Sequence, residues 1–94
     1  MPYVLIQHNV AKYANFESVF RDDEARRRRG GSKSGRLFRN VAEPGNIFAL
    51  FEWDDVEKAQ KFADSYELRE AVKWAGDPSP PRAMVIEEIL QTDA

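Results

Sequence analysis

The sequence predicts an α+β domain in which four strands and two helices follow one another in the order β-α-β-β-α-β. Two short runs, residues 3–6 and 47–53, are apolar on both alternating faces and rich in β-branched and aromatic side chains. Between and after these runs, apolar residues recur at helical spacing. A turn signal at residues 43–46 joins two of the strands as a hairpin.

The first half of the chain reads as a strand followed by a helix. The strand is expected over residues 3–10, and the helix over residues 12 to about 28. Gly30 and Gly31 are expected to end the helix, because glycine readily takes the left-handed conformation found there. The apolar stripe of the helix consists of Tyr13, Phe16, Val19 and Phe20.

A hairpin is expected in the middle of the chain. Residues 32–34 are expected to form a loop, and residues 35–41 the second strand. The Glu43-Pro44-Gly45-Asn46 turn (residues 43–46) then leads into the third strand, residues 47–53, because proline presets φ and glycine and asparagine tolerate positive φ.

The second helix is expected to begin at Asp54. With Glu57 three residues later, Asp54 resembles a capping box. Ser65 offers a second capping position, so residues 67–74 could form a separate short helix. The apolar stripe consists of Val56, Ala59, Phe62, Ala63 and Tyr66.

The last strand completes a ferredoxin-like arrangement. Residues 77–81 are rich in proline and are expected to form a stiff connector into a strand over residues 82–90. The resulting order is the split β-α-β fold with a four-stranded antiparallel sheet. Because crossovers have a preferred hand, both helices are expected on one face. The other face would be a large apolar patch, so we expect a homodimer that covers it.

Composition limits the possible functions. The 94 residues suit a single domain, residues 1–94. The absence of cysteine excludes a disulfide framework, a thiol nucleophile and a zinc–thiolate site. A net charge of −2 gives no indication of nucleic acid or anionic membrane as a partner. The first ten residues resemble neither a signal peptide nor a membrane span, so a cytoplasmic protein is expected.

Four segments of the chain resemble the dimeric α/β-barrel superfamily: YVLIQHNV, GSKSGRLFRN, PGNIFALFEWDD and SYELREAVKWAG. They are most similar to small proteins described as antibiotic biosynthesis monooxygenase-like. The resemblance covers roughly residues 2 to 90. It implies two sheets stacked in a homodimer, with a pocket between each sheet and its helices. Members of the superfamily include cofactor-free monooxygenases acting on polycyclic phenols and haem-degrading enzymes, so the fold alone does not choose a reaction.

The resemblance gives little support to haem chemistry. Haem-degrading members use an asparagine on the first strand, a tryptophan on the second helix and a histidine further along. Asn9 matches the first of these positions, whereas Phe62 stands at the second and Val72 at the third. Valine cannot ligate iron, so we expect no cofactor.

His8 is the only histidine and the main candidate for chemistry. Histidine is the usual proton-transfer group near neutral pH, so His8 is either an acid or base in a pocket or a partly buried side chain bonded to backbone or water. A single histidine without nearby carboxylates gives no metal site. A dyad with Glu52 is not expected, because antiparallel pairing places His8 near Ile47 and Glu52 near Tyr3.

Several other residues have a functional and a structural interpretation. Arg39 could clamp an anion, or could be an edge-strand charge that discourages aggregation. The run of arginines at 26–29 is better explained as the solvated end of a helix, with carboxylates four residues before three of the arginines, than as a phosphate site. Trp53 and Trp74 could form pocket walls or plain core.

The sequence thus predicts a cofactor-independent, monooxygenase-like enzyme acting on a small aromatic or polyketide-like substrate. His8 would transfer a proton, and Asn9 or Arg39 would stabilise a developing oxyanion. The alternative is a non-catalytic homodimer that binds a small apolar, aromatic or anionic ligand or serves a partner protein. The residues expected to line the pocket are Phe16, Phe20, Phe62 and Trp74.

Overall fold

A four-stranded antiparallel sheet with strand order β2-β3-β1-β4 forms the centre of the protein. The structure is a computed structural model and describes residues 1–73 and 81–94. Three helices lie in these ranges, which confirms the predicted α+β class. The elements are β1 (Pro2–Asn9), α1 (Tyr13–Asp22), α2 (Glu24–Gly30), β2 (Ser32–Arg39), β3 (Asn46–Trp53), α3 (Val56–Lys73) and β4 (Arg82–Glu87).

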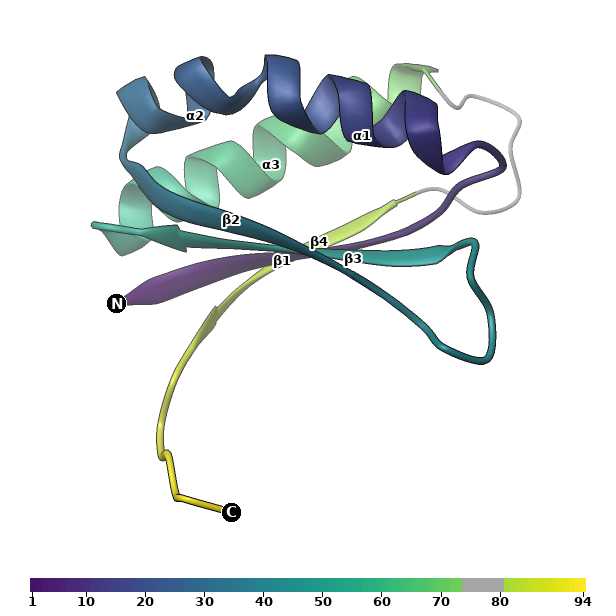
Figure 1. Cartoon of the computed structure of the whole chain (residues 1–94). Coiled ribbons are helices and arrows are strands. Elements are labelled where there is room, and N and C mark those ends of the chain that lie inside the picture. The colour runs from purple at the N-terminus through teal and green to yellow at the C-terminus, as the bar shows by residue number, and fades with distance from the viewer. Residues whose placement is uncertain (74–80) are drawn as a thin grey trace.

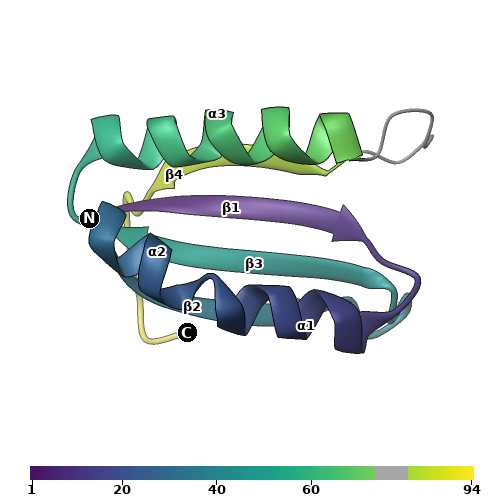
Figure 2. The ribbon, with the colours of Figure 1, turned by 90° about the horizontal axis from the view of Figure 1, so that it is seen from above.

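All three helices cover the same face of the sheet (Figure 1). Seen from above, α1 and α2 follow one another over β2, at one edge of the sheet. On the same face, α3 runs near β4, at the other edge (Figure 2). The apolar core lies between the sheet and α3. Its buried members are Val4, Ile6, Ala49, Phe51, Trp53, Ala59 and Ala63.

The predicted alternation of the central strand is confirmed. The β3 side chains at 47, 49, 51 and 53 are buried beneath the helices, whereas Phe48 and Leu50 lie on the opposite face. On β1, Val4, Ile6 and His8 point toward the helices. His8 pairs with Ile47 and Tyr3 pairs with Glu52, in agreement with the predicted antiparallel arrangement of these two strands.

The first helix differs from the prediction because it is divided at Asp23. Two helices replace the single one expected over residues 12–28, although the backbone bonds from Asp23 N–H to Val19 and from Arg27 N–H to Asp23 continue the helical pattern. The side chains of α2 therefore continue the helical faces of α1. The predicted end is confirmed, since Gly31 has a φ of 118°.

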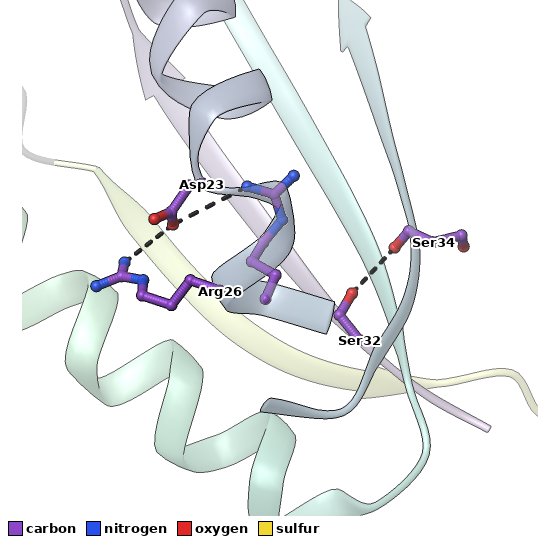
Figure 3. Close-up of polar contacts among 5 residues, drawn as sticks. Asp23, Arg26, Ser32 and Ser34 are labelled. Carbon is purple, nitrogen blue, oxygen red and sulfur yellow. Dashed lines mark hydrogen bonds and ion pairs between the residues drawn. The ribbon is translucent and has the colours of Figure 1, made fainter. Parts of the chain in front are cut away.

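The prediction of a loop at residues 32–34 was wrong, because these residues open β2. Ser32 pairs with Trp53. Its hydroxyl lies 3.3 Å from the carbonyl oxygen of Ser34 (Figure 3). The same hydroxyl lies 3.3 Å from the carbonyl oxygen of Glu52. A register irregularity between Ser32 and Ser34 accommodates this start. β2 ends at Arg39 rather than residue 41.

The start of α3 is capped by a different residue from the one predicted. The Asp55 carboxylate accepts a hydrogen bond from the Glu57 N–H at 2.9 Å, whereas Asp54 pairs with Lys58 at 3.5 Å. The predicted separate helix over residues 67–74 was also wrong, because α3 continues through Ser65 to Lys73. Within the part of the chain that is described, no helix is long and apolar enough to cross a membrane.

The last strand is shorter than predicted. β4 ends at Glu87, three residues before the expected end at residue 90. Most of the predicted connector, residues 77–80, lies outside the described residues, and Pro81 is buried directly before β4. Residues 88–94 leave the sheet on the side away from the helices (Figure 1).

The face of the sheet away from the helices carries the predicted apolar side chains. Phe38, Met84 and Ile86 are exposed there, and further apolar residues between them are half-buried. Antiparallel pairing places Leu5 beside Leu50 and Met84 in one continuous row. No helix in the described ranges covers this surface (Figure 1).

Candidate functional site

A cavity of about 650 Å³ lies between the sheet and the helices. Its lining residues come from β1 and β3, from α1 and α2, and from α3. Figure 2 shows how α1 and α2 lie over one side of the sheet and α3 over the other. The lining is mainly apolar and aromatic, as is usual for a small-molecule site. The described lining residues on the strands and on α3 are Ile6, His8, Ala49, Phe51, Phe62, Tyr66 and Arg69.

His8 lies at one end of this pocket. Only 4% of the side chain is exposed, because β1 turns it toward the helices. Its ring meets the edge of Phe16 with the ring centres 5.8 Å apart. Glu52 lies at the opposite end of the paired strands and on the opposite face, where it accepts a hydrogen bond from the Ser34 hydroxyl at 3.5 Å. The expectation that His8 and Glu52 form no dyad is therefore confirmed.

Arg27 lines the pocket and is a candidate site residue that the sequence interpretation missed. Only 6% of it is exposed. Its guanidinium carbon lies 4.5 Å from the centre of the Phe20 ring and 4.7 Å from that of Phe51. The guanidinium is therefore held against two aromatic rings, which is a cation–π arrangement.

The charge of Arg27 is only loosely compensated. The nearest carboxylate oxygen, Asp23 Oδ2, lies 4.0 Å from its Nη1, whereas the same oxygen is 2.9 Å from Arg26 Nη2 (Figure 3). Burial lowers the pKa of the Arg27 guanidinium from its ordinary value, and the carboxylates of Asp23 and Glu24 partly offset this effect. Arginine nevertheless stays protonated, so a cation lines the pocket.

The helical spacing explains why this one arginine points inward. Arg27 follows Phe20 by seven residues, which is close to two helical turns and the same face. The expected solvated helix end is correct for Arg28, which is exposed and pairs with Glu24 at 3.1 Å. Continuing the apolar stripe of α1 through Asp23 would have placed Arg27 beneath the helix.

The structure brings together only some of the predicted site residues. Phe16, Phe20 and Phe62 line the pocket as predicted. Asn9 lies on the other face of the sheet, where its side-chain oxygen accepts a hydrogen bond from Asn46 at 2.9 Å. Neither Asn9 nor Arg39 occurs in the described lining, so their proposed role toward an oxyanion stays a prediction.

The remaining candidates have structural surroundings. Arg39 lies on the edge strand β2, with its guanidinium carbon 4.9 Å from the centre of the Tyr13 ring. Trp53 belongs to the core and packs against Phe62 at 5.0 Å between ring centres. Trp74 lies outside the described residues.

His8 and Arg27 lie at different levels of the sheet. His8 pairs with Ile47. Phe51, whose ring contacts the Arg27 guanidinium, pairs with Val4. Four residue steps along β1 separate these levels, a distance of about 13 Å. The floor between them is formed by Ile6 and Ala49. The pocket therefore suits an elongated apolar molecule with a polar group toward each end.

Comparisons with known proteins do not assign a family to this chain. No family model matches it, and no curated protein sequence matches it. Within the described residues, no group of three or more histidine, aspartate and glutamate side chains is placed to hold a metal. The functional argument therefore rests on the pocket and its residues.

Proposed function

We propose that the pocket binds a small aromatic or polyketide-like molecule and that the protein is a cofactor-independent, monooxygenase-like enzyme. The observation that carries the proposal is the buried His8 at one end of a cavity lined mainly by apolar and aromatic side chains. A substrate of this class is itself the source of electrons for O₂. The protein then has to bind the substrate, exclude water and move a proton.

In the proposed reaction, His8 accepts a proton from an acidic group of the substrate, such as a phenol. The resulting anion donates electrons to O₂, and a ring carbon forms a bond to oxygen to give a peroxide. The protonated His8 returns its proton to the peroxide. The O–O bond then breaks as the same carbon loses its hydrogen, which gives a carbonyl and one water. A phenol plus O₂ thus gives a quinone plus water, with all electrons supplied by the substrate.

Oxygen uptake tests this proposal. A panel of polycyclic phenols is incubated with the protein under air, and both O₂ consumption and quinone formation are followed. We expect His8→Gln to lower the rate by about 10²- to 10⁴-fold, the usual contribution of a general acid–base. Gln7→Ala is the matched control, because Gln7 is the neighbouring strand residue on the opposite face. Turnover that His8→Gln leaves unchanged would contradict the assigned role of His8.

A non-catalytic binding protein is the second candidate. The observation that favours it is the position of Asn9 and Arg39, neither of which reaches the described pocket lining. The pocket could then hold an aromatic ligand without reacting with it. Ligand binding without O₂ uptake across the whole panel would support this candidate.

We also propose that the domain is ferredoxin-like and that a second copy covers the bare face of its sheet, as in a dimeric α/β barrel. The strand order β2-β3-β1-β4 and the exposed apolar side chains on that face support this proposal. Residues 88–94 extend on the same side, with Ile89 and Leu90 exposed to 91% and 78%. Sedimentation equilibrium should give twice the chain mass, whereas a folded monomer at micromolar concentration would contradict the dimer.

A further inference from the structure

We propose that Arg27 binds the anionic group of the ligand, so that the pocket selects aromatic molecules carrying a carboxylate or a similar anion. This inference rests on the proposed function only in using the same pocket as the ligand site. It assigns a specificity-determining residue at the end of the pocket away from His8.

The first argument is the state of the Arg27 side chain. Its guanidinium carbon lies over the rings of both Phe20 and Phe51, and only 6% of the residue is exposed. A guanidinium has five N–H donors around its edge. In the described part of the chain, none of them makes a hydrogen bond, and the nearest carboxylate oxygen is 4.0 Å away. Donors without a hydrogen-bond partner in a mainly apolar pocket gain from an added acceptor.

The second argument is the charge of the surrounding wall. The cationic members of the described lining are Lys12, Arg26, Arg27 and Arg69, and the acidic member is Asp23. Asp23 is already engaged by Arg26 at 2.9 Å. An anion entering the pocket would therefore meet an excess of positive charge and a fork of donors suited to a carboxylate.

The third argument is the shape of the pocket. Strand geometry separates the level of Arg27 from that of His8 by about 13 Å along β1. Ile6 and Ala49 form the floor of the pocket between these two levels. An aromatic body fits this apolar stretch. With its anion at Arg27, such a ligand points its other end toward His8, where the proposed proton transfer occurs.

Calorimetric titration with a matched pair of probes tests the inference. The probes are para-phenylbenzoate, which is anionic, and para-phenylbenzamide, which is neutral and nearly the same shape. We expect the wild type to prefer the benzoate by about tenfold to a hundredfold, the ratio given by a charged hydrogen bond. Arg27→Met should reduce this preference to near unity. Arg29→Met is the control, because it removes the same charge from α2 at a residue outside the pocket lining.

A second variant keeps the test decisive if Arg27→Met does not fold. Asp23→Asn removes the acidic member of the lining, and Asp23 makes no side-chain cap hydrogen bond to α2. We expect it to tighten benzoate binding by about threefold or more and to leave benzamide binding unchanged. Unchanged or weaker benzoate binding in Asp23→Asn would overturn the inference.

The outcomes separate this inference from the proposed function. Equal affinity of the wild type for both probes, or an equal loss of preference in Arg27→Met and Arg29→Met, overturns the role of Arg27 and leaves the pocket as a ligand site. A wild type that binds neither probe overturns both.

Discussion

Replacing Arg27 by methionine should make the protein more stable while weakening anion binding. Burial of a charge costs several kcal/mol when its partners are poor, and Arg27 has a carboxylate oxygen only at 4.0 Å. The cation–π contacts with Phe20 and Phe51 return about 1–2 kcal/mol. Methionine has a similar length. Its sulfur–aromatic contacts, worth about 0.3–1.5 kcal/mol each, would replace part of this cation–π stabilisation.

The loss of Arg27 also leaves no carboxylate stranded, since Asp23 keeps Arg26 as its partner at 2.9 Å. We therefore expect Arg27→Met to raise the free energy of unfolding by about 1 kcal/mol, which corresponds to a rise in Tm of about 4–8 °C.

Urea unfolding followed by circular dichroism measures this difference, with all variants at one protein concentration so that any dimer contributes equally. Arg29→Met should stay within about 0.5 kcal/mol of the wild type, as expected for an exposed side chain. A loss of more than about 1 kcal/mol in Arg27→Met would refute the reasoning, because Arg27 would then be a structural residue.

Three further predictions follow from local geometry. Asp55→Ala should lower the free energy of unfolding by about 0.5–2 kcal/mol, because the α3 cap is lost. Asp54→Ala should lower it by less than about 0.5 kcal/mol. Equal losses of the two variants in urea unfolding would contradict the capping assignment. Gly35→Ala should cost about 1–3 kcal/mol, because its Cβ would lie 3.0 Å from the Phe51 ring; thermal unfolding unchanged from the wild type would argue against this close packing. Leu50→Glu places a charge on the bare sheet face and should give folded monomers in sedimentation, whereas a persisting dimer would place the interface elsewhere.

The strands could be predicted well because burial fixes their pattern. The run from Ile47 to Trp53 is apolar at every position before Glu52, and one face is buried by the helices as expected. The same reasoning placed His8 on one face of its strand with Val4 and Ile6, and the structure shows that this face lies under the helices. Because both faces of these strands are apolar, the pattern alone did not fix which face the helices cover, and the register comes from the structure.

Local capping and strand starts were less predictable because several residues of similar chemistry stand side by side. Asp54 and Asp55 are both good capping residues, and only the backbone geometry makes Asp55 the acceptor of the Glu57 N–H. Ser32 read as a loop residue but pairs with Trp53 at the start of β2. Such choices depend on tertiary contacts rather than on intrinsic preference.

The candidate site was only partly predictable for a related reason. Phe16, Phe20 and Phe62 were found because aromatic residues at helical spacing indicate a buried stripe. Arg27 was not found, because a run of four arginines after acidic residues is normally a solvated helix end. Arg27 points inward because the backbone hydrogen bonds continue the helical pattern through Asp23.

A crystal structure of the protein with para-phenylbenzoate tests the central claim most directly. We predict that a carboxylate oxygen lies within hydrogen-bond distance of the Arg27 guanidinium, with the rings over Ile6 and Ala49 and the far end toward His8. A benzoate seated on the bare face of the sheet, or an Arg27 side chain turned into solvent while the pocket is occupied, would contradict the account.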